Sequence, residues 1–282
     1  MFKLGMITDE VSQDLTVAAE FAVKYGATEL EIRSVDGKGP FEMDETDIQN
    51  IKAIADKYNL HVSGFSAPLF KCSISDKETV EKHIASFERL AKYCGTLGCN
   101  LIRGFDFWDE GASLQSRIDA YQPIIAICEK YGIICVIEYD PSVHSCTAVK
   151  TNELIAAINS PYIKSLFDPG NGLWADANDI PYPNDYELLG DKIAHIHIKD
   201  ADFVDGKIDA VKVGTGKVDY KGLFKRLIDD NYSGCVMLET HYRKAAVLTE
   251  EQLKLPGGAA FSDGAYEASA ESMESILSMI NE

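Results

Sequence analysis

The feature that most constrains the fold is a unit that recurs along the chain: an amphipathic helix ends at Gly or Asn, and a short apolar run follows at once. Clear copies end at Lys24-Tyr25-Gly26, at Lys57-Tyr58-Asn59 and at Lys130-Tyr131-Gly132. Gly or Asn directly after a helix favours a C-terminal cap, and an apolar run of about four to eight residues is typical of a buried strand. The pattern predicts alternating helices and strands.

Eight apolar segments fit the strand part of this unit. They are residues 3–8, 29–33, 61–65, 101–104, 133–138, 163–167, 193–198 and 234–239. Helical patterns lie between them at residues 15–25, 47–58, 79–97, 114–131 and 220–230, and residues 265–280 form a last helix.

Alternating strands and helices indicate parallel strands, and eight such units indicate a closed (β/α)8 TIM barrel of the α/β class. The alternative is an open, doubly wound sheet, which usually has a glycine-rich loop after its first strand. Here Ile7-Thr8-Asp9-Glu10 contains no glycine. No linker-like segment interrupts the pattern, so we expect a single domain over residues 1–282.

Composition narrows the classes of partner and compartment. Asp and Glu total 45 against 27 Lys and Arg, a formal net charge of −18 that repels nucleic acids and anionic membranes. We therefore expect neither as a partner. The N-terminus lacks the apolar region of an export signal, and no stretch approaches the ~20 apolar residues of a membrane span. Seven cysteines are scattered without C-x-x-C spacing. We expect reduced core cysteines and a cytoplasmic protein.

Candidate functional residues stand at the ends of four consecutive predicted strands: Glu138, Asp168, His197 and Glu239. In a (β/α)8 barrel these ends meet at the face that carries active sites. Three carboxylates that converged there unpaired would raise one another's pKa, and a divalent cation would remove that conflict. Mixed oxygen and nitrogen ligation suits Mn²⁺, Mg²⁺, Co²⁺ or Zn²⁺ and does not choose among them.

Several motifs resemble one known family. They are Phe167-Asp168-Pro169-Gly170-Asn171, His195-Ile196-His197-Ile198-Lys199-Asp200, Val213-Gly214-Thr215-Gly216-Lys217-Val218-Asp219-Tyr220 and Leu238-Glu239-Thr240-His241. With Ile7 to Glu10 and Glu29 to Arg33, they resemble the sugar phosphate isomerase/epimerase family of the xylose-isomerase-like barrels over nearly the whole chain. Ketose 3-epimerases, inosose dehydratases, hydroxypyruvate-type isomerases and zinc endonucleases share this scaffold, so the motifs do not identify a substrate.

The resemblance implies that Glu138, Asp168, His197 and Glu239 hold one divalent metal ion, and that Glu138 and Glu239 are catalytic acid/base groups on opposite faces of the substrate. The implied reaction is isomerisation or epimerisation of a keto-sugar, cyclitol ketone or sugar phosphate through an enediolate. An inosose-dehydratase-like lyase is the alternative, because it shares the first proton abstraction. A homo-oligomer, dimer or tetramer, is in keeping with the resemblance. A zinc endonuclease is disfavoured because the early strands lack histidines at their ends.

Six further residues are candidates for substrate contacts. They are Asn171, His144, Lys199, Arg33, Arg103 and Trp108. Each has a structural alternative: Asn171 and His144 as loop residues, the three cations in ion pairs, and Trp108 in an oligomer contact. His195 shares a strand face with His197 but lies one layer deeper, which favours a supporting role. The Gly214-Thr215-Gly216-Lys217 turn lacks the remaining residues of a phosphate-binding P-loop, so we expect no nucleotide site.

Overall fold

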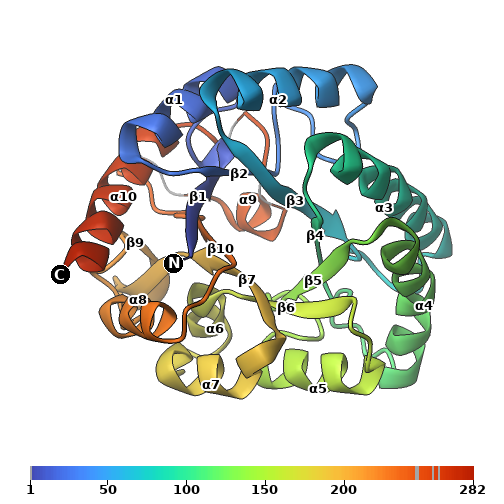
Figure 1. Cartoon of the computed structure of the whole chain (residues 1–282). Coiled ribbons are helices and arrows are strands. Elements are labelled where there is room, and N and C mark those ends of the chain that lie inside the picture. The colour runs from blue at the N-terminus through green and yellow to red at the C-terminus, as the bar shows by residue number, and fades with distance from the viewer. Residues whose placement is uncertain (1, 245–247, 256, 260) are drawn as a thin grey trace.

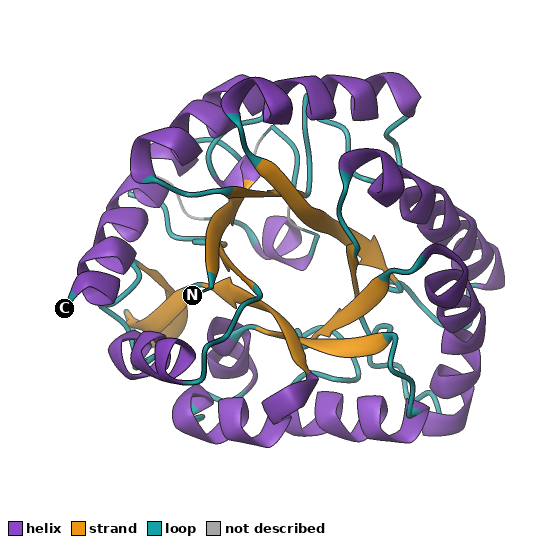
Figure 2. Ribbon diagram, in the orientation of Figure 1, coloured by secondary structure: helices purple, strands orange, loops and turns teal. Residues whose placement is uncertain are grey.

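The computed structural model describes residues 2–244, 248–255, 257–259 and 261–282. Eight strands form a closed barrel in the order β1-β10-β7-β6-β5-β4-β3-β2, and every neighbouring pair is parallel (Figures 1 and 2). The barrel strands are β1 (Lys3–Ile7), β2 (Glu29–Ile32), β3 (His61–Leu69), β4 (Leu101–Gly104), β5 (Ile134–Glu138), β6 (Ile163–Phe167), β7 (Ile193–Ile198) and β10 (Cys235–Leu238). The predicted TIM barrel is confirmed.

Helices surround the barrel in Figure 2. The longer ones are α1 (Leu15–Tyr25), α2 (Glu45–Tyr58), α3 (Lys77–Leu97), α4 (Leu114–Tyr131), α5 (Ala148–Ile158), α8 (Tyr220–Asp229) and α10 (Ala265–Asn281). Short helices are η1 (Thr8–Glu10), α6 (Pro169–Ala175), η2 (Pro181–Asp185), α7 (Tyr186–Leu189), η3 (Gly190–Lys192) and α9 (Glu250–Lys254). The sequence pattern predicted all the longer helices except α5.

Local capping explains the helix boundaries. The Asp44 side chain accepts from the backbone of Thr46 and Asp47, and Asp47 returns a bond to the Asp44 backbone, which completes a capping box at the start of α2. Residues in the left-handed conformation follow the ends of α1, α2 and α4, as the recurring unit predicted, and also those of α3 and α5: they are Gly26, Asn59, Gly132, Gly98 and Asn159. Each reverses the chain directly before a barrel strand.

A hairpin that the sequence pattern did not predict follows β7. Strands β8 (Asp200–Val204) and β9 (Lys207–Val211) pair in antiparallel fashion outside the barrel. Both residues of the connecting turn, Asp205 and Gly206, have positive φ, at 50° and 81°. Asp-Gly between short apolar runs is a strong hairpin signal, so this turn was the evidence from which the hairpin could have been found.

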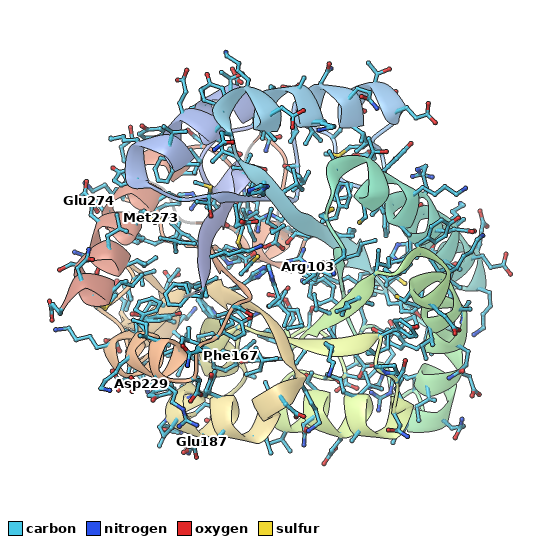
Figure 3. All side chains as sticks on the ribbon, viewed as in Figure 1. Arg103, Phe167, Glu187, Asp229, Met273 and Glu274 are labelled. Carbon is cyan, nitrogen blue, oxygen red and sulfur yellow. The ribbon has the colours of Figure 1, made fainter. Side chains whose placement is uncertain are left out.

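The interior of the barrel is polar toward the carboxyl ends of its strands. Figure 3 shows Arg103 near the middle of the barrel, whereas Glu187, Asp229 and Glu274 lie on the outer helices. Arg33, Arg103 and Lys199 are each at most 3% exposed. Buried charges are rare unless they are paired, so these cations mark a dense polar network. In the described ranges, no helix is long and apolar enough to cross a bilayer.

Substitution of two glycines by alanine should change the free energy of unfolding in opposite directions. A Cβ on Gly5 of β1 would collide with the backbone oxygen of Glu29 in β2, whereas a Cβ on Gly95 in α3 would meet nothing within 4 Å. We expect Gly5→Ala to destabilise the protein by about 1–3 kcal/mol through overpacking. We expect Gly95→Ala to stabilise it by about 0.5–1 kcal/mol, because alanine favours a helix interior. Urea unfolding of both variants is the measurement, and equal effects would contradict the close β1–β2 packing.

Candidate active site

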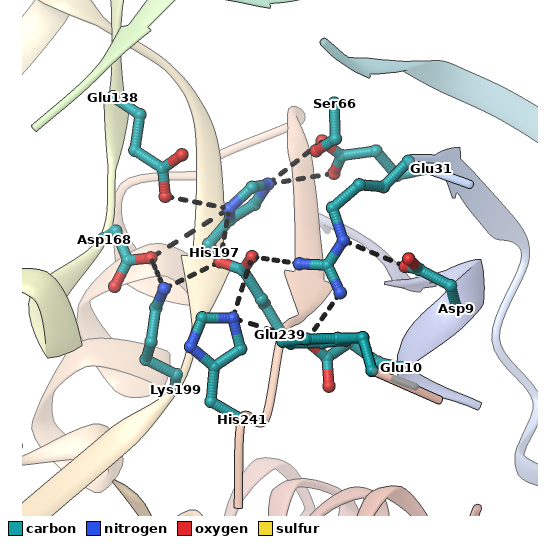
Figure 4. A network of polar contacts seen from close by, with 12 residues as sticks. Asp9, Glu10, Glu31, Ser66, Glu138, Asp168, His197, Lys199, Glu239 and His241 are labelled. Carbon is teal, nitrogen blue, oxygen red and sulfur yellow. Dashed lines mark hydrogen bonds and ion pairs between the residues drawn. The ribbon is translucent and has the colours of Figure 1, made fainter. Parts of the chain in front are cut away.

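Four side chains from four strand ends meet at one point of the barrel mouth (Figure 4). The Nδ1 atom of His197 lies 3.1 Å from Glu239 Oε2, 3.4 Å from Glu138 Oε1 and 4.0 Å from Asp168 Oδ2. One donor atom from each of the four lies within 4.8 Å of the others, and all four residues are buried. We call Glu138, Asp168, His197 and Glu239 the quartet.

Local structure orients each carboxylate of the quartet. Asp168 is the N-cap of α6, and its Oδ1 accepts from the Asn171 backbone at 3.1 Å. Glu138 accepts from Arg103 at 2.9 Å and from the Asn171 side chain at 3.1 Å. Lys199 Nζ lies 2.9 Å from Asp168 and 2.8 Å from Glu239. Gly170 leaves room for the Lys199 side chain, because a Cβ there would collide with it.

A second layer of contacts fixes the imidazole of His197. Its Nε2 lies 3.0 Å from Glu31 Oε2, and the same carboxylate bonds His195 Nε2 at 2.7 Å. Ser66 also donates to Glu31. A carboxylate on one ring nitrogen fixes the orientation of the imidazole and makes the other nitrogen a better ligand. His195 therefore supports the quartet from one layer deeper, in the position that strand alternation indicated.

The cations around the quartet decide its protonation. Burial raises the pKa of Glu138 and the Glu239 charge adds to it, but the Arg103 guanidinium and the His197 contact together outweigh both, and the pKa falls to about 2. Burial also raises the pKa of Glu239, yet Lys199, His241 and His197 hold it well below its usual range. For Asp168, burial dominates over Lys199 and the neighbouring glutamates add to it, so the pKa rises to about 8. The two glutamates are thus held ionised.

The donor set fits a divalent ion. Ligands at about 2.0–2.2 Å from one ion stand about 3–4 Å from each other, and the oxygen-to-Nδ1 separations of 3.1, 3.4 and 4.0 Å fall in this range. Glu31 occupies the far nitrogen of His197, so Nδ1 is the nitrogen that faces the carboxylates. Three carboxylate oxygens and one imidazole nitrogen suit Mn²⁺, Mg²⁺, Co²⁺ and Zn²⁺.

A cavity of about 370 Å³ opens beside the quartet, within the size range of small-molecule sites. Of the six predicted substrate contacts, Asn171, Lys199 and Arg103 line it. Arg33 lines an adjacent cavity instead and bonds Asp9, Glu10 and Glu239.

The structure places the other two predicted contacts outside the lining of this cavity. His144 lies 2.9 Å from Asp109, and its backbone bonds the loop after β4. Trp108 lies under the Lys254 ammonium, with Nζ 4.4 Å from the ring centroid. Both belong to the loops at the rim, and their role as substrate contacts stays a prediction.

Several lining residues were not among the predicted contacts. They include Lys71, Phe105, Asp140, Trp174 and His241. His241 lies 3.3 Å from Glu239 and stands two residues after it, at the end of the Leu238-Glu239-Thr240-His241 motif. Asp140 likewise stands two residues after Glu138. Period-two alternation beyond a strand end was a signal that could have found both, whereas Lys71 lies in a loop and Trp174 in the short helix α6, where no such signal applies.

The glycine-rich turn before α8 binds an internal carboxylate. The backbone amides of Gly214 and Gly216 each donate to Asp200 at 2.9 Å, and the amide of Val218 donates at 3.2 Å. These donors are occupied by Asp200, which joins the turn to the start of β8. The arrangement agrees with the interpretation of the turn as structural.

Comparison with known proteins places the fold in a family. A family model described as a xylose isomerase-like TIM barrel matches residues 19–276. An inosose dehydratase from Geobacillus kaustophilus is 22% identical over 265 residues, which cover 82% of this chain and 80% of that protein. A putative L-ribulose-5-phosphate 3-epimerase from Escherichia coli, SgbU, is 38% identical over 100 residues, which cover 34% of this chain and 33% of that protein.

Solved structures share the architecture across the whole chain. A D-allulose 3-epimerase from Methylomonas sp. in complex with D-allulose has a TM-score of 0.72 at 18% identity, and the match covers 99% of this chain and 97% of that one. The IolI protein with a bound zinc atom has a TM-score of 0.75 at 20% identity, with 99% and 98% covered. At these identities the likeness establishes the fold alone.

The contact between Glu31 and His197 generates a prediction about metal affinity. We expect Glu31→Gln to weaken divalent-metal binding by about 10–100-fold, because the carboxylate that orients His197 is lost. Glu29→Gln is the matched control: Glu29 is buried on the same strand and no contact joins it to the quartet. Calorimetric titration with Mn²⁺ and Zn²⁺ is the measurement. Equal affinity in the two variants would show that Glu31 has no such role.

The rim loops generate a prediction about pH. Asp106 accepts from Ser145 at 2.6 Å and contacts Arg117, but burial dominates and raises its pKa to about 6. The folded protein thus binds this proton more tightly than the unfolded chain, and the contribution of Asp106 to stability falls as the pH rises from about 4 to about 6. The excess stability of the parent protein over Asp106→Asn should therefore be larger at pH 4 than at pH 7 in urea unfolding. A difference independent of pH would contradict this.

Proposed function

The chain belongs to the xylose isomerase-like TIM-barrel family, and from that membership we propose that it is a divalent-metal-dependent isomerase or epimerase. Its substrate is a keto-sugar, a cyclitol ketone or a sugar phosphate, and the reaction begins with removal of a proton next to the carbonyl. The family resemblance read from the sequence motifs is confirmed. The reaction and the roles of individual residues are proposals from the geometry.

The observation that carries the proposal is the quartet beside the cavity. Glu138 and Glu239 both line the cavity, and they enter it from β5 and β10, which β6 and β7 separate in the barrel. Two carboxylates that approach one substrate from different strands can act on different faces of it. This arrangement supports proton removal by one glutamate and proton return by the other.

The chain's own residues prepare both glutamates for these roles. Arg103 and Asn171 hold Glu138 ionised and oriented, ready to accept a proton from carbon. Glu239 is held in place by Lys199 at 2.8 Å and His241 at 3.3 Å, and the proton that it returns comes from solvent. Epimerisation returns the proton to the same carbon from the opposite face, and isomerisation returns it to the adjacent carbon.

The quartet would hold the metal ion, with Glu31 and His195 behind it. The chemistry that a divalent ion supplies when bound is polarisation of the carbonyl and acidification of the neighbouring C–H bond. This matters here because a glutamate with a pKa of about 2 is a weak base and needs an acidified C–H bond. The zinc named for the IolI structure and the sugar named for the D-allulose 3-epimerase agree with this proposal.

A second candidate is a lyase that resembles inosose dehydratase. The observation that favours it is the relative of that name, whose similarity extends over 82% of this chain. Such an enzyme would use the same proton abstraction and would then expel a hydroxyl group from the next carbon as water. The product distinguishes the two candidates: the product of a lyase has lost one water molecule and gained a double bond, whereas the product of an epimerase has the same mass as the substrate.

The test follows the α-proton. We expect the manganese-loaded protein to exchange the α-proton of at least one ketose, ketose phosphate or inosose with deuterium in D₂O, as measured by NMR. Glu138→Gln should lower the rate by at least about 100-fold, because the loss of a positioned base costs ~10²–10⁴. Removal of the metal by a chelator should lower it as well, and Mn²⁺ should restore it.

The control removes a carboxylate from the outside of the molecule. Glu187→Gln on α7 changes the net charge by the same amount at an exposed ion pair with Arg226. Its exchange rate should stay within about twofold of the parent protein, as is usual for surface substitutions. Exchange that survives in Glu138→Gln, or exchange that no metal affects, would overturn the proposal.

A further inference from the structure

A buried ion pair in the cavity wall has no part in the chemistry proposed above. Lys71, in the loop after β3, is 5% exposed, and its Nζ donates to Asp140 Oδ2 at 2.8 Å. Both residues line the cavity. The ammonium also lies 4.5 Å from the centroid of the Phe105 ring. Burying a lysine is costly unless its partners are well placed, which favours a function in ligand binding for this ion pair.

The pair lies in the same cavity as Glu138, and Asp140 follows Glu138 in the loop after β5. Asp140 follows Glu138 by two residues, at most about 7 Å along an extended chain. The Phe105 ring contacts both Lys71 and Arg103, whose Cζ lies 4.8 Å from the ring centroid. A chain of five or six carbons with bonds of about 1.5 Å covers a similar distance. A sugar of this length whose carbonyl lies at Glu138 can therefore reach Lys71 and Asp140, which line the same cavity.

The unused hydrogen-bonding capacity of the pair matches a hydroxyl group. Lys71 has three protons: one is donated to Asp140, and the ring of Phe105 takes up a second direction. Asp140 Oδ1 accepts from both the backbone and the hydroxyl of Ser142, while among the described residues Oδ2 accepts only from Lys71. One donor and one acceptor remain, side by side, and a hydroxyl group needs one of each.

We propose that Lys71 and Asp140 together recognise the terminal hydroxyl group of an unphosphorylated sugar-like substrate, and so determine the specificity of the site. The inference rests on the proposed function and narrows its substrate class. Lys71 donates to the hydroxyl oxygen, and Asp140 accepts the hydroxyl proton. A substrate without this hydroxyl leaves the remaining donor of Lys71 and the remaining acceptor site of Asp140 without a partner in the complex, and a site built to bond a hydroxyl group rejects the analogue that lacks it.

A terminal phosphate fits this wall poorly. Asp140 is held in place by Ser142 and Lys71, so a phosphate beside Lys71 would meet a fixed like charge. Of the other cations that line the cavity, Arg103 and Lys199 already bond carboxylates of the quartet, and the Lys254 ammonium lies over the Trp108 ring. The formal charge of −18 also disfavours the approach of a dianion.

The experiment measures binding in the metal-loaded Glu138→Gln protein, where the ligand is not consumed. Calorimetry first identifies the 2-ketohexose that binds most tightly. Its 6-deoxy and 6-phosphate forms are then compared with it, in this background and with Lys71→Met or Asp140→Asn added. Both substitutions break the same ion pair, one from each side. Lys82→Met, at an exposed helix pair with Glu78, controls for the loss of one positive charge.

We expect the parent ketose to bind about tenfold or more tightly than the 6-deoxy form, because the 6-deoxy form leaves the remaining donor of Lys71 and acceptor of Asp140 without a partner. Lys71→Met and Asp140→Asn should each remove most of this preference, and Lys82→Met should keep it. The phosphate should bind more weakly than the parent ketose, and Asp140→Asn should strengthen phosphate binding while Lys71→Met weakens it further. General damage to the fold would instead weaken all three ligands alike and leave their ratios unchanged.

Three results would overturn the inference: no binding of any ketohexose, a phosphate that binds more tightly than the parent ketose, or a preference for the hydroxyl that survives both substitutions. These outcomes are separate from those for the proposed function. A hydroxyl preference that depends on Lys71, found in a protein without Glu138-dependent exchange, would keep this inference and remove the proposed reaction. Glu138-dependent exchange that favours phosphorylated substrates would keep the proposed reaction and remove this inference.

Discussion

The structure depends on how a barrel keeps six carboxylates buried around one point. Asp9, Glu10, Glu31, Glu138, Asp168 and Glu239 are each at most 2% exposed. Isolated buried charges are prohibitively costly, so each needs a partner. Arg33 alone bonds three of these acids, and Lys199 bridges two. The network holds the side chains in one geometry, and a divalent ion at the quartet would add positive charge where the acids are most crowded.

The fold delivers this geometry through ordinary backbone chemistry. Asp168 caps α6 with one carboxylate oxygen and faces Lys199 with the other, so the helix start itself orients a proposed ligand. Glu31, one layer deeper than the mouth, fixes His197 from behind. Because each proposed ligand has a neighbour that restricts it, the site is organised before any substrate arrives, which lowers the cost of positioning at the moment of reaction.

The strands and the loops contribute different residues to the candidate site. Strand ends supply the quartet, whose chemistry suits any substrate with a proton next to a carbonyl. Loops supply Lys71 after β3, Phe105 after β4 and Asp140 after β5, which line the cavity beyond the quartet. Proteins similar to this chain carry the names of different reactions, as is general for this barrel fold, on which loop variation supports many chemistries.

The sequence alone determined the barrel, because eight apolar runs alternated with capped helices, and it determined the quartet, because residues that end parallel strands must meet at one face. It did not reveal the β8–β9 hairpin or α5, nor did it show that His144 and Trp108 stay on the rim. Lys71 and Asp140 stand 69 residues apart in the chain, and no periodicity relates two loops. Which loop side chains meet depends on how each loop packs against its neighbours, and only the tertiary structure decided that.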